Sequence, residues 1–335
     1  MRKLTDINNL KNTDRYLIDL SNLKSSLIKY QSNFLSEKQI KKFYNHPEKG
    51  FPLLCPVGLR CFEYLKNNFC FNINKKVFKK KIFFASKKKY SPAENFFKNK
   101  NIFSLPTSIK PRYKKLFNEI SISNNNLKKE ISKLKKQKKI IGAFQTRNIP
   151  HLGHEKIIQK LLKKCDVVFV NPVIGPKKKG DIKPEVLEKV YQFLVKKHYK
   201  KKLVYHPVYA NMFYSGPREA AHHANIRERL GFDYFIVGRD HAGAENFYPK
   251  NASSKLLTKH KNKFKIKIIT HQGSYFCKTH NQVVIKDECK NKKCKLLNIS
   301  GTDFRKAIKE KKMFKYARTD LQMYLFKYNK SLFYK

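Results

Sequence analysis

Short apolar runs alternate with amphipathic segments between residues 139 and 237, and this alternation is the clearest structural signal in the chain. Short runs of mostly apolar residues predict buried strands, whereas apolar side chains that recur every three or four residues predict helices. The expected strands are 139–144, 166–170, 203–205 and 234–237, and the expected helices are 154–164, 185–197 and 219–230. Strands that alternate with helices in this way form a doubly wound parallel sheet. We therefore predict an α/β fold for this part of the chain.

The first 125 residues have a less regular pattern. Residues 27–28 and 51–57 are short apolar runs between polar loops, and residues 71–84 alternate apolar and lysine residues in a way that favours a hairpin. Residues 121–126 have a turn-like composition and indicate a boundary, and residues 127–139 have a helical, lysine-rich composition. We predict two domains, a β-rich domain at residues 1–125 and the α/β domain at residues 126–335.

The composition is that of a folded protein with an unusual charge. Of the 335 residues, 41% are hydrophobic, including 26 Phe and 18 Tyr, which is enough for a sizeable core. The formal net charge of +51 is typical of proteins that bind nucleic acids or anionic membranes. However, the excess is mostly lysine, spread from end to end, and it accompanies abundant Asn, Ile, Phe and Tyr with no Trp, which is equally typical of an AT-biased coding sequence. The net charge alone therefore does not decide whether the protein has a specific anionic partner.

Three features bear on the compartment. The chain contains no run of about 18 apolar residues, so we expect no membrane-spanning helix and no membrane partner. Charges are scattered through the first 20 residues, which argues against a secretory signal. The seven cysteines are an odd number, which favours a reducing compartment over a disulfide framework. We expect a cytoplasmic protein.

The segment 145–155, Gln-Thr-Arg-Asn-Ile-Pro-His-Leu-Gly-His-Glu, joins the first expected strand to the first expected helix. His151 and His154 are three residues apart, so their imidazoles lie on one side of a helix N-terminus. Backbone amides and imidazoles at such a position can hold phosphate oxygens, and Gly153 leaves room for a nucleotide. A pair of capping or surface histidines is the structural alternative, but the preceding Gln-Thr-Arg-Asn favours a functional site.

Three further clusters lie where this architecture would place a ligand. Residues 238–243, Gly-Arg-Asp-His-Ala-Gly, directly follow a strand and combine free amides with Arg239, a group suited to phosphate or sulfate. Residues 300–305 form a helix start with a good N-cap and place Arg305 in the first turn. Arg218 precedes another helix, and we interpret it as a structural ion-pair partner rather than an anion ligand.

Four soft ligands occur in two pairs, in the pattern Cys277-x2-His280-x8-Cys289-x4-Cys294. Paired spacing of this kind predicts a tetrahedral zinc site, and four protein ligands make such a site structural rather than catalytic. The alternative is three reduced thiols and a loop histidine.

The motif His-x-Gly-His after the first strand, with a late Ser-x-Thr-x-x-Arg, resembles the nucleotidylyltransferase superfamily, whose members direct attack on the α-phosphate of a nucleoside triphosphate. Segments 145–155, 216–220, 238–243 and 300–305 together resemble, in order and spacing, the ATP sulfurylase (sulfate adenylyltransferase) family of bacterial type. The resemblance covers about residues 139–310 and implies a Rossmann-like domain, preceded at residues 1–125 by a PUA-like domain and carrying a zinc knuckle at residues 277–294.

The resemblance also implies a reaction and a set of site residues. ATP and sulfate would give adenosine 5′-phosphosulfate and pyrophosphate, with Mg²⁺ bound to ATP and the enzyme assembled as a homo-oligomer. The implied sulfate-binding residues are Gln145, Arg147 and Ala242. The implied catalytic residues are Thr146, Arg147, Asn148, His151 and His154. The implied ATP-binding residues are Arg147, Asn148, Ile149, Pro150, Gly238, Arg239, Asp240 and His241.

The sequence departs from the family pattern at two positions and in the order of its zinc ligands, where the histidine stands second instead of last, and it leaves other functions open. Ile149 stands where the family has proline, and Glu245 lies where a less charged stretch is expected. One alternative is another nucleotidylyltransferase with a phosphorylated acceptor. A second is an RNA-binding protein built on the PUA-like domain and the +51 charge, but the chain has no RNP-type motif, so we do not expect a nucleic-acid partner.

Overall fold

The computed structural model describes residues 15–56, 70–85, 89–98, 103–104, 113–176, 180–239, 241–243, 246–289, 294–328 and 331–334. A five-stranded sheet with the order β10-β9-β4-β5-β7 lies at the centre of the molecule, and all its pairings are parallel. Its strands are Ile141–Phe144 (β4), Val167–Val170 (β5), Leu203–Tyr205 (β7), Tyr234–Val237 (β9) and Lys267–Thr270 (β10). The strand order reverses between β4 and β9, which is where sheets of this kind bind ligands.

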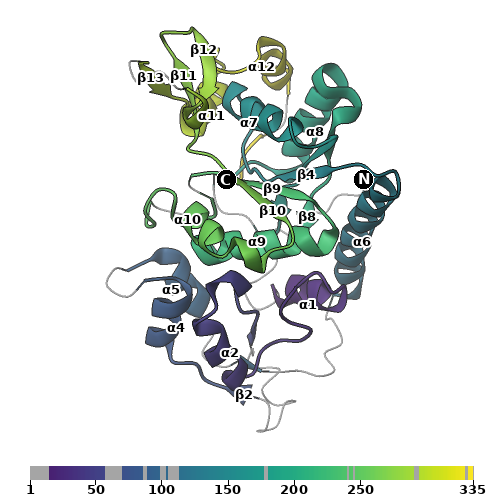
Figure 1. Ribbon diagram of the computed structural model, residues 1–335, viewed down its shortest axis with the longest axis vertical. Coiled ribbons are helices and arrows are strands. Elements are labelled where there is room, and N and C mark those ends of the chain that lie inside the picture. Colours follow the sequence, from purple (N-terminus) through teal and green to yellow (C-terminus); the bar gives the residue numbers. More distant parts are fainter. Residues whose placement is uncertain are drawn as a thin grey trace.

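Helices cover both faces of the sheet. They are Lys114–Lys136 (α6), Leu152–Leu162 (α7), Pro184–Leu194 (α8), Pro217–Leu230 (α9) and Ala252–Lys259 (α10). Helices α7 and α8 lie on one face, and α9 and α10 lie on the other (Figure 1). Because both faces are covered, every residue of β4 and β5 is buried. The doubly wound α/β prediction is confirmed for this part of the chain, while strand β10 was not among the predicted elements.

Smaller elements complete the part of the chain after residue 113. They are Val173–Ile174 (β6), Val195–Tyr199 (η3, a π-helical turn), Lys200–Lys202 (η4), Val208–Tyr209 (β8), Lys261–Lys263 (η5), Ser274–Cys277 (β11), Gln282–Ile285 (β12), Lys286–Glu288 (η6), Leu296–Asn298 (β13), Gly301–Lys309 (α11) and Thr319–Phe326 (α12). Strands β12, β11 and β13 form an antiparallel sheet that projects beside α7, α11 and α12 (Figure 1). None of the helices in the described part of the chain combines the length and apolar character needed to cross a bilayer.

The described part of residues 1–125 is mainly helical, so the β-rich prediction is wrong there. The elements are Tyr16–Lys24 (α1), Glu37–Tyr44 (α2), Pro47–Lys49 (η2), Cys55–Pro56 (β1), Cys70–Phe71 (β2), Lys75–Ile82 (α4), Ser91–Phe97 (α5) and Phe103–Ser104 (β3). The expected hairpin at residues 71–84 is instead helix α4. The residue in the sequence that indicates this helix is Asn74, whose side chain caps it by accepting a hydrogen bond from the Val77 amide at 3.0 Å. Phe78 and Ile82, four residues apart, are both buried, which is a helical spacing.

Two other predicted features of this region also differ from the structure. Residues 27–28 form no strand, and within residues 51–56 only Cys55–Pro56 pairs with another strand. The turn expected at residues 121–126 lies inside α6, which runs unbroken across the predicted boundary at residue 125. Asn124 is tolerated within α6 because its side chain bonds Asn22 and both the amide and the carbonyl of Tyr209, at 2.9–3.0 Å.

Arg218 joins the N-terminal region to α9. Its buried guanidinium donates to the backbone carbonyls of Phe43, Tyr44, His46, Gly50 and Lys81 at distances of 2.8–3.2 Å. The structural interpretation of Arg218 is therefore confirmed, although its partners are carbonyl groups rather than a carboxylate. The contact is close enough that a Cβ on Gly50 (φ +86°) would lie 2.7 Å from the His222 Cα atom. One continuous apolar core accordingly contains residues from both sides of the predicted boundary.

Candidate active site

A cavity of about 320 Å³ opens at the carboxyl ends of β4 and β9, where the strand order reverses. The lining includes most of the predicted site residues from two loops. The loop after β4 contributes Gln145, Thr146, Arg147 and Asn148, the helix that follows contributes His154, and the loop after β9 contributes Gly238, His241 and Ala242. The structure thus brings together two segments that are about 90 residues apart in the sequence.

Hydrogen bonds hold the loop after β4 in a fixed shape. The Thr146 hydroxyl accepts from the Asn148 amide at 3.1 Å, and the Asn148 side-chain oxygen accepts from Nη1 of Arg305 at 2.8 Å. Arg305 also donates to the Thr302 hydroxyl at 3.0 Å. Ser300 caps α11 by accepting from two backbone amides, which confirms the predicted helix start and identifies Ser300 as its cap. The helix start predicted at residues 300–305 therefore supports the cavity through Arg305.

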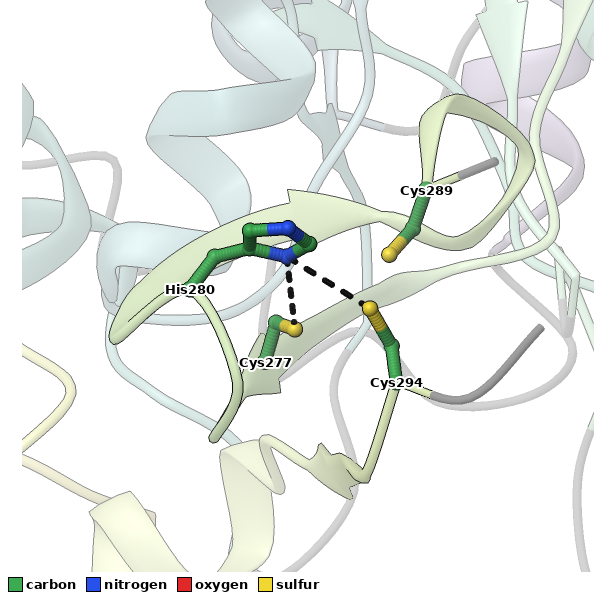
Figure 2. Close-up of side chains that lie close together, drawn as sticks. All are labelled: Cys277, His280, Cys289 and Cys294. Carbon is green, nitrogen blue, oxygen red and sulfur yellow. Dashed lines mark hydrogen bonds between the residues drawn. The ribbon is translucent and has the colours of Figure 1, made fainter. Parts of the chain in front are cut away.

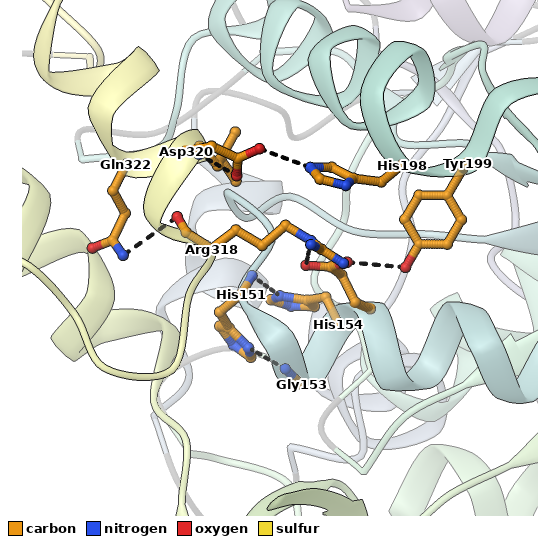
Figure 3. Close-up of polar contacts among 10 residues, drawn as sticks. His151, Gly153, His154, His198, Tyr199, Arg318, Asp320 and Gln322 are labelled. Atoms are coloured by element: carbon orange, nitrogen blue, oxygen red, sulfur yellow. Dashed lines mark hydrogen bonds and ion pairs between the residues drawn. The ribbon is translucent and has the colours of Figure 1, made fainter.

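The two histidines of the His-x-Gly-His motif form a reciprocal cap on α7. Nδ1 of His151 accepts from the Gly153 amide at 3.1 Å, and Nδ1 of His154 accepts from the His151 amide at 3.3 Å (Figure 3). A neutral imidazole with an accepting Nδ1 carries its proton on Nε2. His154 lines the cavity, so it offers the cavity an N–H donor. The capping and functional interpretations of this pair are therefore compatible.

A buried carboxylate fixes this helix start from behind. Glu155 accepts from Nε of Arg318 with 2.8 Å to each carboxylate oxygen, and from the Tyr199 hydroxyl at 3.0 Å. The Leu152 amide donates to the Tyr316 carbonyl at 2.8 Å. The chain just before α12 thus anchors the first turn of α7, which carries the histidine pair.

The loop after β9 has a strained backbone at the cavity wall. Ala242 has φ +58°, a left-handed conformation that costs a non-glycine residue about 1 kcal/mol. Such a turn lets successive amides face an anion. Arg239 does not line the cavity; its Nη1 atom donates to the Tyr275 hydroxyl at 2.5 Å. Asp240 and Glu245 lie outside the described residues.

The remaining predicted ligands lie behind the cavity wall. Ile149 and Pro150 are buried, and Ile149 belongs to the core beneath α7. His151 is also buried and does not line the cavity directly, although its ring centroid lies 3.9 Å from that of His154.

Several lining residues were missed at the sequence level. His271 follows β10, and its Nδ1 atom accepts from the Gly273 amide at 3.2 Å, the same arrangement as in His151. The sequence feature that could have indicated His271 is the short apolar run of β10 just before it. This run resembles the other strands, but it follows a long polar stretch and was not recognised as a strand. The other missed lining residues are Phe144, Ile157, Val173, Asp181, Met212, Tyr214, Ile236 and Gly243, of which only Gly243 lay within a predicted cluster.

Desolvation keeps the imidazoles of the site neutral. Burial lowers the pKa of His151 and of His271 to about 4. Desolvation also lowers the pKa of His154 and of His241 well below the ordinary value. Neighbouring imidazoles add to the effect at His154, and neighbouring imidazoles and arginines add to it at His241. The positive charge of the described cavity lining comes from Arg147, whose guanidinium carbon lies 5.9 Å from the centre of the Tyr214 ring. Burial raises the pKa of Tyr214 to about 12, so its hydroxyl remains protonated.

The four predicted zinc ligands lie together at the antiparallel β11–β13 sheet, with Cys277 at the end of β11 and the other three in the segments that connect the strands. The ligand atoms of Cys277, His280, Cys289 and Cys294 all lie within 4.8 Å of one another (Figure 2). Nδ1 of His280 lies 3.2 Å from the Cys277 sulfur and 3.5 Å from the Cys294 sulfur. Three thiolates and one imidazole at these separations fit the tetrahedral coordination that structural zinc prefers.

The cavity is equipped for anion chemistry rather than proton abstraction. It combines one guanidinium, three neutral imidazoles that follow different strands, the side-chain amides of Gln145 and Asn148, one carboxylate (Asp181) and a strained backbone turn. The Gln145 side-chain oxygen is buried and has no hydrogen-bond partner among the described residues. Preorganised donors of this kind stabilise charge that develops on phosphoryl oxygens.

Comparisons with known proteins agree with this arrangement. The family model for ATP-sulfurylase matches residues 118–316. The chain is 39% identical over 173 residues to a sulfate adenylyltransferase from Hyperthermus butylicus, covering 51% of this chain and 44% of that one. It is 38% identical over 208 residues to a sulfate adenylyltransferase from Carboxydothermus hydrogenoformans, covering 61% and 54%. The chain thus spans about half the length of the curated relatives it matches.

One solved structure has a similar fold. A chain of the hexameric APS kinase from Thiobacillus denitrificans superposes with a TM-score of 0.62 at 11% identity, covering 93% of this chain and 61% of that one. At this identity the likeness concerns the fold alone, and it extends over nearly the whole of the present chain.

Proposed function

The chain belongs to the ATP-sulfurylase family, and we propose that it is a sulfate adenylyltransferase that converts ATP and sulfate to adenosine 5′-phosphosulfate and pyrophosphate. The observation that carries the proposal is the cavity that residues 145–148 share with Gly238, His241, Ala242 and Gly243. Each of these segments follows a parallel strand on either side of the point where the strand order reverses. A nucleotide and a small dianion bound there would meet at the same place.

Arg147 is the residue best placed to hold sulfate, together with Gln145 and the Ala242 amide. Arg147 carries a fixed charge, and its planar group matches a tetrahedral oxyanion. The Gln145 side chain is half-buried at the cavity wall, and its unpartnered oxygen leaves the amide free to turn its NH₂ group towards a ligand. The turn at Ala242 would add a backbone donor. Asn148 and the Gly238–His241 segment would hold the triphosphate.

The proposed reaction requires that negative charge on the phosphates be stabilised and that sulfate be positioned in line with the α-phosphorus and the leaving pyrophosphate. A sulfate oxygen attacks the α-phosphorus, and the bond to the β-phosphate oxygen breaks with its electron pair leaving on pyrophosphate. Sulfate is fully ionised near neutral pH, so no general base is needed. The Nε2–H group of His154 would stabilise negative charge on the phosphates, with His151 holding its ring in place; Thr146 would hold the turn that places Arg147 and Asn148. Mg²⁺ bound to the triphosphate would neutralise part of its charge.

Four finer assignments belong to the same proposal. Zinc bound by Cys277, His280, Cys289 and Cys294 would have a structural role, supported by the clustering of the four ligand atoms. A PUA-like fold for residues 1–125 is supported only by the three short antiparallel strands β1, β3 and β2. Assembly as a homo-oligomer and a cytoplasmic location rest on the family resemblance.

The experiment is a pyrophosphate-release assay with ATP, Mg²⁺ and a panel of acceptors. We expect release that depends on sulfate and is absent with phosphorylated acceptors such as phosphopantetheine. Release that depends on a phosphorylated acceptor and not on sulfate would replace this proposal with another nucleotidylyltransferase. Salt-sensitive RNA binding without any ATP binding would favour the RNA-binding alternative.

A further inference from the structure

Three ionisable side chains connect the buried interior of α9 with the cavity. Glu219 and His223 lie one turn apart on α9 and are both 0% exposed. Nε2 of His223 lies 3.5 Å from Oε1 of Glu219, its nearest carboxylate oxygen, and makes no hydrogen bond with the described residues, so this nitrogen is free to form one with Glu219. On its other side, Nδ1 of His223 lies 3.1 Å from Nε2 of His241. His241 lines the cavity, and its Nδ1 atom has no partner among the described residues. Glu219, His223 and His241 thus form a row of ionisable groups, and this row ends on a ring nitrogen that is available to a ligand.

The surroundings of Glu219 favour a proton on this carboxylate. Its oxygens accept from the amides of Phe213 and Ser215 at 2.9 Å each, and no arginine or lysine pairs with it among the described residues. Burial raises the pKa of Glu219 to about 7, although these two hydrogen bonds oppose the shift. The carboxyl group thus changes charge close to neutral pH.

The surroundings of the histidines keep a positive charge off their rings. The buried Arg227 guanidinium donates to the carbonyls of His223 and Asn171 at 3.3 and 2.8 Å, and it has no carboxylate partner in the described structure. Desolvation, and then the charge of Arg227, lower the pKa of His223 well below the ordinary value. A proton that enters this row is therefore held on Glu219 rather than on His223 or His241.

The protonation of Glu219 decides which nitrogen of His241 carries hydrogen. When Glu219 is ionised, it attracts the Nε2–H of His223, whose Nδ1 then accepts from Nε2–H of His241, so that Nδ1 of His241 has no hydrogen. When Glu219 is protonated, it can donate to Nε2 of His223, whose Nδ1–H then donates to Nε2 of His241. Nδ1 of His241 then carries the proton and can donate to an anion. The two arrangements differ by one proton.

We propose that Glu219 and His223 are positioning residues that turn His241 into a hydrogen-bond donor for the bound anion, and that ligand binding takes up one proton on this row. The proposal rests on the function proposed above and adds two residues outside the cavity to its machinery. Neither residue touches the ligand, and both act through the tautomer of His241.

Other ionisable groups surround the row from neighbouring elements. Arg147 from the loop after β4 and His271 from the loop after β10 both disfavour a positive charge on His241. Tyr214 and Tyr248 lie near Glu219, and burial raises the pKa of both hydroxyls, so they stay neutral around pH 7. Burial lowers the pKa of His222, the neighbour on α9, to about 3. Near neutral pH, Glu219 is therefore the member of this group that titrates.

The test is calorimetric binding of adenosine 5′-phosphosulfate to the full chain at about pH 8, in two buffers of different ionisation enthalpy. This ligand has no group that titrates near neutral pH. We expect the wild type to take up close to one proton per ligand and its Kd to weaken about tenfold per pH unit above pH 7. In Glu219→Gln, whose amide can donate to His223 at any pH, proton uptake should fall near zero and Kd should become nearly independent of pH.

His223→Gln interrupts the row at its middle and should also abolish proton uptake, whereas His222→Asn, which alters a buried histidine outside the row, should retain it. The wild-type measurement stands without any variant. Binding without proton uptake by the wild type, or unchanged uptake in Glu219→Gln, would overturn this inference and leave the proposed function intact. Absence of any binding by the wild type would overturn both.

Discussion

Arg147 is the one guanidinium in the described cavity lining, and it lies at the tip of the loop after β4. The imidazoles around it are neutral, so the fixed positive charge for a dianion comes from this side chain. A second guanidinium, that of Arg305, donates a hydrogen bond to Asn148, the residue that follows Arg147. The loop therefore presents one guanidinium to the ligand and uses another to hold its own shape.

Replacing Arg147 with alanine should lower sulfate-dependent pyrophosphate release about 10²–10³-fold, because it removes a charge that acts on the reacting groups. The fold should be unchanged, since Arg147 is exposed at the cavity mouth. Steady-state kinetics and circular dichroism of the variant measure the two effects. Arg229→Ala, which removes an exposed arginine on α9, is the matched control and should turn over like the wild type. Equal activity in the Arg147 variant would remove this residue from the site.

At the level of single residues, the sequence predicted those site residues that follow a recognisable strand. Gln145–Asn148, His241 and Ala242 were predicted because the runs before them are strongly apolar, and the structure places them at the cavity. His271 and Tyr214 were not predicted, because each reaches the cavity from an element whose position depends on tertiary packing. Likewise, no local pattern shows that Arg239 turns towards Tyr275 rather than the cavity.

Among the elements, α9 carries the largest share of buried polar groups. Arg218 at its start holds five backbone carbonyls of the N-terminal region, and Glu219 holds the amides of the preceding loop. The N-terminal region is thus attached to the helix that also carries the row of groups leading to His241.

Arg218→Ala should lower the free energy of unfolding by about 3–5 kcal/mol, because it leaves five carbonyls without their donor and opens a cavity. Burial lowers the pKa of Arg218 to about 10, so the native side chain is still charged near neutral pH. Urea unfolding measures the change, and limited proteolysis should show earlier cleavage in residues 15–85. Arg229→Ala, which loses one bond to the Ser26 carbonyl, should cost less than about 1 kcal/mol. Similar costs for the two variants would show that the Arg218 contacts contribute little.

The antiparallel β11–β13 sheet should depend on zinc for its order. We expect one zinc ion per chain by elemental analysis, and loss of the ion in Cys289→Ser. Removal by a strong chelator should lower Tm by roughly 5 °C or more, because the ligand cluster joins β11 to the two segments that connect the strands of this sheet. Cys165→Ala, which alters a buried cysteine outside the cluster, should keep its zinc. A chain that purifies without zinc and does not bind it when supplied would contradict this prediction.

Element prediction succeeded where helices and strands alternate and failed where aromatic and lysine residues alternate. In residues 71–84 the sequence satisfies both a strand and a helix period, and the Asn74 cap and tertiary packing select the helix. In α6 the three consecutive asparagines resemble a turn, but long-range bonds from Asn124 stabilise the helix through them.

The whole molecule combines a charge of +51 with six histidines that are held neutral. Desolvation lowers the pKa of each; they are His151, His154, His222, His223, His241 and His271. A histidine whose folded pKa lies below its unfolded value binds more protons when unfolded. Folding stability is therefore lost as pH falls below about 6.5.

We expect the free energy of unfolding to fall by several kcal/mol between about pH 6.5 and pH 5, since each such proton contributes up to about 1.4 kcal/mol per pH unit. Glu219, whose pKa is raised to about 7, acts in the opposite direction, but it is one group against six. Acid also adds charge to an already cationic chain. Urea unfolding at several pH values tests this, and stability that stays constant or rises over the same interval would contradict it.

The central claim is that the loops after β4 and β9 hold a nucleotide and a sulfate group side by side in one cavity. A crystal structure of the full chain with adenosine 5′-phosphosulfate tests this most directly. The account predicts the sulfate group within hydrogen-bond distance of Arg147 and the Ala242 amide, and the α-phosphate beside His154 and the Gly238–His241 segment. A ligand bound elsewhere, or an arrangement in which Arg147 and His241 do not contact the same molecule, would contradict it.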